Sequence, residues 1–344
     1  MPQPLSEDLA ACRALLRGGS RSFFVAALML PRHVHRPATA LYAFCRIADD
    51  LIDGAGDPEA GLADLRRRLD KVYAGDPQPY PPDRALAAIV AQHGIPRTLL
   101  DALLEGFAWD AAGRAYDTLA DLEAYAARVA GAVGAMMAVL MGTRSAEAVA
   151  RACDLGVAMQ LSNIARDVGE DARAGRLYLP RDWLREAGID PEAWLACPWP
   201  DPALAGVVRR LLLAADALYA QADAGIAALP LACRPGIGAA RRLYAGIGQQ
   251  VARNGYDSLS RRAAVPTARK IGLVLRSTAR ALHPHAALPY PPLGATRFLV
   301  DAVTATPARP MTRRVLWQDF DKRVAWLCAL YERIDDHQAQ RSPS

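Results

Sequence analysis

The sequence predicts an all-α protein, and three observations lead to this prediction. Apolar residues recur at intervals of three and four positions over most of the 344-residue chain, as in helices that bury one face. Ala, Leu and Arg, which favour helices, dominate these stretches. The alternation of apolar and polar residues that is typical of half-buried strands does not extend over any useful length.

Proline- and glycine-rich stretches separate the periodic segments and set the expected helices in order. GDPQPYPPD ends the third helix and HGIP the fourth, while ACPWPDP precedes the eighth and PYPPLG follows the tenth. Pro37 favours the first turn of the second helix, where a missing N–H costs no hydrogen bond. We expect helices at residues 6–17, 37–53, 58–74, 83–93, 96–109, 118–141, 145–168, 203–228, 234–256, 267–281 and 314–336.

Composition and charge narrow the class of partner. Hydrophobic residues make up 52% of the chain, which is enough for a sizeable core. The formal charge is +5, and lysine occurs only at positions 71, 270 and 322, so the positive charge is almost all arginine. This excess suggests anionic partners such as phosphorylated substrates or lipid headgroups. It is too weak and too scattered to indicate nucleic-acid binding.

The chain shows no sign of export, which favours a cytoplasmic protein. The N-terminal residues carry acids where a secretory signal needs bases. No stretch reaches the roughly 18 uncharged apolar residues of a membrane span, and the longest candidate, residues 129–141, is too short. The six cysteines lie far apart without a CxxC pair, as expected of reduced thiols. The six histidines form no HExxH-type metal site.

The segment RIADDLID places three aspartates in a helix that is otherwise suited to the core. On a helical wheel Tyr42, Arg46, Asp49 and Asp53 form one polar stripe. Asp50 lies about 100° away from this stripe, which makes it a weaker candidate. Two carboxylates at i and i+4 repel each other, and one arginine offsets only part of this repulsion. Taken alone, the stripe also fits a solvated helix surface.

A second segment, QLSNIARDVGED, repeats this arrangement. Gln160, Asn163, Asp167 and Asp171 fall on one stripe of another helix, and Arg166 again stands beside the acids. If the two helices face each other, four carboxylates and one amide oxygen form a cage. Hard oxygen ligands suit Mg²⁺ or Mn²⁺ rather than zinc, and Mg²⁺ is usually completed by substrate phosphates. The two stripes together therefore predict a metal-dependent site for a phosphorylated substrate.

Four blocks of the sequence resemble, in order, the signature blocks of the squalene/phytoene synthase family. They are SRSFF, ALYAFCRIADDLID, EAYAARVAGAVGAMM and QLSNIARDVGEDARAGRLYLP, within a match over roughly residues 10–280. Within the family the chain looks most like the bacterial phytoene synthases. Ala165 and Ala132 depart from the usual bulkier aliphatic residue and threonine, which could bear on chain-length preference. The resemblance implies the isoprenoid synthase fold, a helical bundle around a central cavity.

The resemblance also implies roles for individual residues. The implied metal ligands are Asp49, Asp53, Asn163, Asp167 and Asp171. The implied catalytic residues are Tyr125, Tyr244, Arg46 and Arg166. The implied substrate-binding residues are Ser20, Ser22, Phe23, Tyr42, Gln160, Arg176 and Tyr178, with Arg269 and Lys270 as further phosphate contacts. Residues 169–175 would close over the phosphates as a lid.

By resemblance, the activity is the head-to-head condensation of two geranylgeranyl diphosphates to phytoene in carotenoid biosynthesis. The reaction would pass through prephytoene diphosphate and release diphosphate, with three Mg²⁺ or Mn²⁺ ions per site and no NADPH. A squalene or dehydrosqualene synthase acting on farnesyl diphosphate is the main alternative. Further alternatives are a terpene cyclase, a chain-elongating synthase and a non-enzymatic assembly factor. The presence of all four stripe aspartates argues against an assembly factor, in which the acidic motifs are lost.

The resemblance also leads to expectations for the domain bounds, the membrane contact and the partners of the protein. Residues 1–282 are expected to form the catalytic domain. Residues 283–344 are expected to form a proline-rich connection and a C-terminal helix packed on the same domain. Because substrate and product are apolar and the C-terminus is polar, we expect peripheral contact with a membrane surface rather than insertion. Downstream carotenoid enzymes are possible partners.

Overall fold

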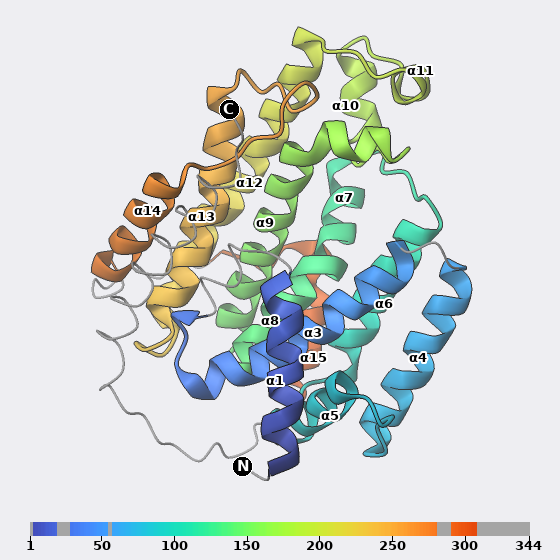
Figure 1. Ribbon diagram of the computed structural model, residues 1–344. Coiled ribbons are helices and arrows are strands. Elements are labelled where there is room, and N and C mark those ends of the chain that lie inside the picture. Colours follow the sequence, from blue (N-terminus) through green and yellow to red (C-terminus); the bar gives the residue numbers. More distant parts are fainter. Residues whose placement is uncertain (1–2, 19–27, 54–56, 281–289, 308–344) are drawn as a thin grey trace, which may run out of the picture.

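The computed structural model describes residues 3–18, 28–53, 57–280 and 290–307 (Figure 1). All regular secondary structure in these ranges is helical, which confirms the predicted all-α class. The helices in chain order are α1 (Gln3–Gly18), α3 (Arg32–Asp53), α4 (Pro58–Ala74), α5 (Pro81–His93), α6 (Arg97–Ala111), α7 (Leu119–Ala126), the π-helix η1 (Ala127–Gly131), α8 (Ala132–Leu140), α9 (Ala146–Arg173), α10 (Arg181–Glu186), α11 (Pro191–Ala196), α12 (Pro202–Ala228), α13 (Arg234–Arg253), α14 (Thr267–Arg280), the 3₁₀-helix η2 (Gly294–Thr296) and α15 (Arg297–Thr304).

α3 begins earlier than the sequence predicts. The carbonyl oxygen of Pro31 accepts hydrogen bonds from the N–H groups of Val34 and His35, so that the helix starts at Arg32. Pro37 therefore lies inside the helix, and its predicted place in the first turn is wrong. Proline has no N–H group, so this turn of the helix loses one backbone hydrogen bond.

The side of α3 opposite its polar stripe is largely buried. Leu41, Phe44, Ala48 and Ile52 are at most 5% exposed, whereas Leu51, next to the aspartates, is 37% exposed. The remaining polar stripe is free to carry chemistry at the edge of the core.

The predicted helix at residues 118–141 is interrupted by the π-helix η1. A capping box starts α7, in which Thr118 Oγ1 accepts from the N–H of Asp121 and the Asp121 carboxylate accepts from the N–H of Thr118. A Cβ added to Gly106 of α6 would lie 2.5 Å from the Cγ1 of Val129 in η1. Such π-turns are frequent near functional sites, and apolar periodicity does not reveal them.

Three short helices lie outside the predicted set. α10 and α11 contain six residues each, too few for a 3.6-residue period to show. α15 lies within the predicted proline-rich connection, and its Leu299, Val300 and Val303 are buried against the core. The predicted helix at residues 314–336 lies outside the described residues.

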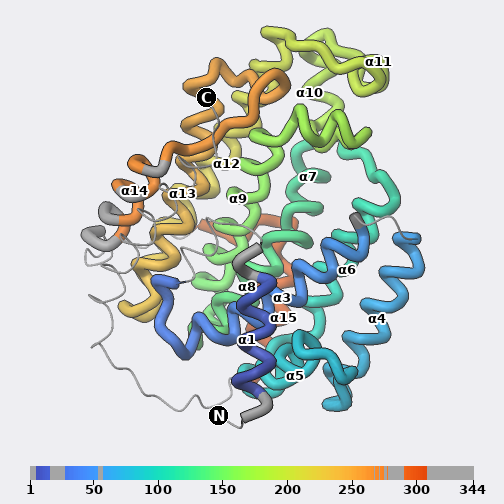
Figure 2. The backbone as a smooth tube through the Cα atoms, viewed as in Figure 1, coloured from blue at the N-terminus to red at the C-terminus, as the bar shows by residue number. Residues whose placement is uncertain are grey.

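α9 is the central helix of the fold (Figures 1 and 2). It contacts α8, α12, α13 and α15. α12, α13 and α14 lie on one side of it, and α4, α5 and α6 on the other. A Cβ added to Gly134 would lie 2.2 Å from the carbonyl oxygen of Ala152, and one added to Gly156 would lie 2.3 Å from that of Ala130. These glycines therefore let α8 and η1 pack directly on α9.

The segment after the main bundle folds back onto it. The carbonyl oxygen of Pro291 accepts a hydrogen bond from Arg151 Nη2, and that of Thr306 accepts one from Arg144 Nη1. The guanidinium carbon of Arg128 lies 5.4 Å from the ring centroid of Phe298. Residues 290–307 thus share the core of the preceding helices.

By length and composition alone, Leu119–Leu140 could cross a membrane, although it contains charged residues and is therefore not the uncharged stretch that was sought in the sequence. This stretch comprises α7, η1 and α8. Because 61% of its most apolar window is buried inside the structure, it resembles the core helix of a globular protein.

Candidate active site

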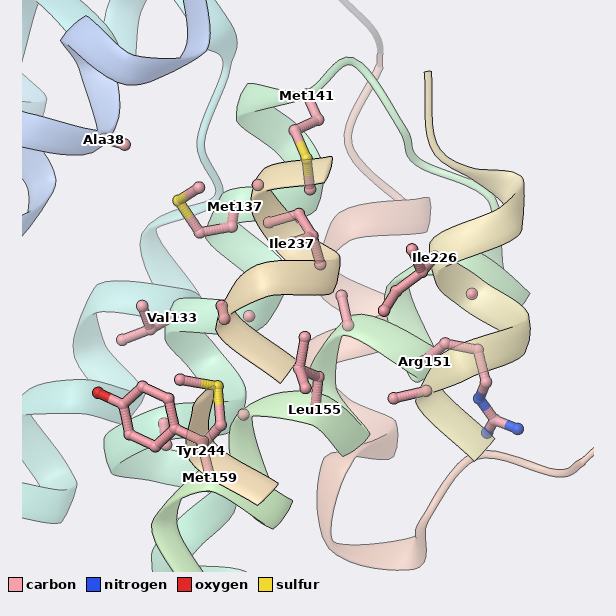
Figure 3. Close-up of a pocket in the computed structure, with 18 of the residues that line it drawn as sticks. Ala38, Val133, Met137, Met141, Arg151, Leu155, Met159, Ile226, Ile237 and Tyr244 are labelled. Carbon is pink, nitrogen blue, oxygen red and sulfur yellow. The ribbon is translucent and has the colours of Figure 1, made fainter. Parts of the chain in front are cut away.

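An apolar cavity lies among α3, α8, α9, α12 and α13 (Figure 3). α9 contributes one continuous face to it, at a helical spacing of three and one: Ala148, Arg151, Ala152, Leu155, Gly156, Met159, Gln160 and Asn163. In Figure 3, Tyr244 and Met159 lie toward one end of the cavity and Met141 lies at the other. The predicted central cavity is therefore present beside the acidic helices.

One end of the cavity is polar. It is lined by Tyr42, Gln160, Asn163 and Tyr244, which we call the polar end. One helical turn further on, Asp49 follows Cys45 on α3 and Asp167 follows Asn163 on α9. The Oδ1 atom of Asn163 is buried and has no hydrogen-bond partner within the described structure. An unsatisfied buried oxygen at this point is suited to a cation or a ligand donor.

The second acidic motif is covered by arginines. Arg166 Nε donates to Asp167 Oδ1 at 2.7 Å, and its Nη2 contacts Oδ2. Arg262 Nε donates to the same Oδ1 at 2.9 Å and lies 3.3 Å from Glu170 Oε2. Burial, and then the charge of Asp167, raise the pKa of Asp171 to about 7. The motif thus contains a carboxylate whose charge is poorly compensated and which a divalent cation would stabilise.

A short loop fixes Arg262 beside this motif. The N–H of Gly169 on α9 donates to the carbonyl oxygen of Ser258 at 3.0 Å. A Cβ at position 169 would lie 2.5 Å from the carbonyl oxygen of Leu259, so only glycine permits this approach. Asp257 Oδ1 accepts from the N–H groups of Leu259 and Ser260 and stiffens the loop. The sequence gives no local signal for this contact, which joins positions about 90 residues apart.

The first acidic motif is more exposed. Arg46 Nη1 lies 3.4 Å from Asp49 Oδ2, and its Nη2 lies 2.6 Å from Asp50 Oδ1. The side chains of Asp49 and Asp50 are 47% and 54% exposed. Arg46 therefore reaches both acids, although the helical wheel separated them. Asp53 is the last residue of α3, and its side chain lies outside the described part of the chain.

The predicted metal cage is not assembled among the described residues. No group of three or more His, Cys, Asp or Glu side chains in this part of the chain is arranged to hold an ion. Asp49 and Asp167 pair with arginines instead. The oxygen-only donor set nevertheless fits Mg²⁺ or Mn²⁺, since it includes the unsatisfied Asn163 oxygen and the strained Asp167–Asp171 pair.

Tyr125 and Tyr178 do not line the cavity. Their hydroxyls donate to Asp110 Oδ2 and Oδ1, each at 2.8 Å. Tyr116 packs on both rings, with centroids 5.2 and 6.1 Å away. Burial, and then the charge of Asp110, raise the pKa of Tyr125 and Tyr178. The sequence did not single out Asp110 and Tyr116, because only the fold brings them to these tyrosines.

The remaining predicted residues have mixed outcomes. Ser20, Ser22 and Phe23 lie outside the described residues. The N–H of Arg176 donates to the carbonyl oxygen of Asp171 at 2.8 Å, which keeps it beside the second motif.

The last two outcomes concern predicted phosphate contacts and the lid. Arg269 Nη2 donates to Gln249 Oε1 at 2.5 Å. The phosphate contacts expected of Arg269 and Lys270 stay predictions. Most of the segment 169–175, which is expected to form a lid, is helical, because α9 continues to Arg173. Its closure over the phosphates stays a prediction.

Comparisons with known proteins agree with this site. Residues 16–269 match the family model described as squalene/phytoene synthase. The chain is 52% identical to the phytoene synthase of Cereibacter sphaeroides over 90% of this chain and 91% of that protein. It is 56% identical to the phytoene synthase of Rhodobacter capsulatus over 78% and 80%. A 15-cis-phytoene synthase of a Paracoccus species is 44% identical over 74% and 86%.

Solved structures give the same result. A dehydrosqualene synthase in complex with a ligand superposes with a TM-score of 0.74 at 32% identity, over 80% of this chain and 97% of that one. A squalene synthase from Alicyclobacillus acidocaldarius gives 0.69 at 27% identity, over 74% and 97%. The isoprenoid synthase fold and a prenyltransferase activity are thereby confirmed. The family implies dependence on a divalent metal and a prenyl diphosphate substrate. The chain belongs to the squalene/phytoene synthase family.

Proposed function

We propose that this chain is a phytoene synthase in carotenoid biosynthesis. It joins two geranylgeranyl diphosphates head to head, through prephytoene diphosphate, and releases diphosphate. The observation that carries this proposal is the identity of 52% and 56% to two phytoene synthases over most of the chain. The same comparisons favour phytoene synthase over the squalene synthase alternative, since the solved squalene-type enzymes are less similar.

The arginines at the polar end bind and stabilise the leaving diphosphate. Arg46, Arg166 and Arg262 all stand within an ion pair's reach of the acidic motifs. Charge-assisted hydrogen bonds from guanidinium groups to phosphate oxygens strengthen as the allylic C–O bond breaks. Because the three guanidinium groups are held by carboxylates, they would exchange these partners for the diphosphate when substrate binds.

The acidic motifs supply the ligands of the metal. Asp49, Asp53, Asn163, Asp167 and Asp171 would hold three Mg²⁺ or Mn²⁺ ions when substrate is present. The ions would neutralise the charge that develops on the diphosphate.

The apolar cavity protects the allylic carbocation from water. Its walls between the polar end and Met141 are formed mainly by Met, Leu, Ile, Val and Ala side chains, and Arg151 also lines it. Tyr244 stands at the polar end, where an aromatic face stabilises positive charge. Loss of a proton from the last cation, rather than hydride transfer, gives a triene, so we propose that no NADPH is used.

Product analysis tests this proposal. The protein is incubated with C20 diphosphate and Mg²⁺ without nicotinamide, and the product is identified by mass and ultraviolet absorption. A C40 conjugated triene is the expected result. A C30 product from C15 diphosphate as the preferred reaction, or a requirement for NADPH, would contradict the proposal.

We further propose a cytoplasmic protein that binds the membrane surface without inserting and delivers its product to later carotenoid enzymes. The product is uncharged and apolar, and the net charge of +5 adds attraction to anionic lipid. Each basic residue near such a surface contributes about 1 kcal/mol. The protein should sediment partly with anionic vesicles and be released by high salt. Full retention in the supernatant at low salt would contradict surface binding.

A further inference from the structure

The cavity has a measurable depth along α9, because one helical face lines it from end to end. Asn163 stands at the polar end and Ala148 is the last lining residue on this helix. At a rise of about 1.5 Å per residue, the 15 positions between them span roughly 22 Å. Ala152, 11 positions from Asn163, stands roughly 16 Å deep.

A prenyl chain can be measured on the same scale. Each isoprene unit adds four chain carbons, and with single bonds of about 1.5 Å it extends the chain by roughly 5 Å. Three units therefore reach about 15 Å and four units about 20 Å. The third unit ends near Ala152, and the fourth occupies the space between Ala152 and Ala148.

The depth scale agrees with the opposite walls. Gly134 of α8 lies directly against Ala152. A Cβ added to Gly134 would lie 2.2 Å from the carbonyl oxygen of Ala152. Met137 of α8 and Met141, directly after α8, line the deeper part. Ile226 of α12 and Leu229, directly after α12, close the same part of the cavity. We call these four residues and Ala148 the floor; Figure 3 shows Met137, Met141 and Ile226 around this space.

We propose that Ala152 is a specificity-determining residue, whose small side chain keeps the passage to the floor open for the fourth isoprene unit. The inference rests on the proposed function and specifies its substrate as a C20 diphosphate. The Ala152 side chain is partly exposed although its neighbours Arg151 and Cys153 are buried, because it faces the open cavity. Side chains on a helix lean toward its N-terminus. A larger side chain at 152 therefore points toward Ala148 and fills the space of the fourth unit.

The experiment compares kcat/KM for C20 and C15 diphosphates in the wild type and in Ala152→Val and Ala152→Leu. The ratio of C20 to C15 should fall stepwise, by at least about tenfold in Ala152→Leu, since a pocket discriminates about 10–200-fold per methylene. Activity with C15 diphosphate should be retained. Ala148→Leu, whose side chain leans beyond the fourth unit, should lower the ratio less. Ala146→Leu, at an exposed position of the same helix, should leave the ratio unchanged.

The possible outcomes distinguish a failure of the proposed function from a failure of the role assigned to Ala152. A wild type that prefers C15 diphosphate would overturn the proposed function and, with it, the C20 specificity. A wild type that prefers C20, with an unchanged ratio in folded Ala152→Leu, would overturn the role of Ala152 alone. Equal losses with both substrates would assign Ala152 a structural role instead. Thermal denaturation identifies variants that do not fold. If Ala152→Leu does not fold, the C20 to C15 ratio of Ala152→Val, which adds only two methyl groups, decides whether Ala152 sets the specificity.

Discussion

The two acidic motifs at the polar end are similar in sequence but differ in how the structure holds them. On α9, Asp167 is 17% exposed and is paired with Arg166 and Arg262. On α3, Asp49 is 47% exposed and is paired with Arg46, which also pairs with Asp50. One motif is fixed by a neighbouring loop, whereas the other is held by one arginine of its own helix.

This difference indicates a division of roles. The α9 motif is preorganised, because the contact between Gly169 and Ser258 fixes Arg262 before any ligand arrives. Groups that are preorganised stabilise developing charge without reorganising during the reaction. The α3 motif has fewer constraints, so we expect ligand binding to order it. The predictions below separate the two motifs by the size and kind of their effects.

Chelation should have the largest effect, because both motifs depend on the same ions. Excess EDTA should abolish release of pyrophosphate from C20 diphosphate, and added Mg²⁺ or Mn²⁺ should restore it. Both acidic motifs offer hard oxygen ligands for such ions. Undiminished turnover in EDTA would show that the carboxylates serve another purpose.

Asp167→Asn and Asp49→Asn should each lower kcat by more than about 100-fold, since each removes a ligand from the site. The fold should stay intact, because neither side chain belongs to the apolar core. Steady-state kinetics and thermal denaturation would check both statements. Asp50→Asn serves as the control within the exposed motif and should cost less. Equal losses at Asp49 and Asp50 would show that the pairing of Arg46 with Asp50 marks a functional contact.

Gly169→Ala should affect only the preorganised motif. The added Cβ would lie 2.5 Å from the carbonyl oxygen of Leu259, so the loop must move away from α9. Overpacking of this kind costs about 1–3 kcal/mol, and Arg262 would lose its position beside Asp167. Thermal denaturation should show the loss of stability, and kcat should fall with it. A variant with wild-type stability would mean that the loop yields without cost.

Arg262→Gln should have the smallest effect of this series. Its side chain is 52% exposed, and exposed ion pairs contribute at most about 1 kcal/mol to stability. We expect an unchanged melting temperature, a raised KM for the prenyl diphosphate and a modest fall in kcat, which separates a role at the diphosphate from a structural one. An unchanged KM would remove Arg262 from the diphosphate site.

The sequence predicted the parts of this site that depend on helical period. The stripes of Tyr42 to Asp53 and Gln160 to Asp171 follow from spacing alone, and so does the apolar face between them. The contact of Arg262 with Asp167 and the cluster of Tyr125 and Tyr178 around Asp110 depend on tertiary packing. No local pattern reports such pairs, because each joins segments that are distant in sequence.

The differences in secondary structure have a similar cause. The π-helix η1 forms where Gly106 lets α6 approach Val129, a contact that lies outside any sequence window. α15 is only eight residues long and follows several prolines, so the sequence predicts a connection where Leu299 and Val303 are buried in a helix. α9 extends past Gly169, where the loop at Ser258 and Leu259 packs against it.

Diffraction from crystals grown with Mn²⁺ and inorganic pyrophosphate tests most directly whether the two motifs share one metal site. The anomalous signal of Mn²⁺ locates the ions independently of the protein coordinates. We predict peaks between α3 and α9, within bonding distance of both Asp49 and Asp167, with Arg166 or Arg262 moved from Asp167 to the pyrophosphate. Peaks on one helix only, or pyrophosphate bound with both arginines still paired to Asp167, would contradict a shared site.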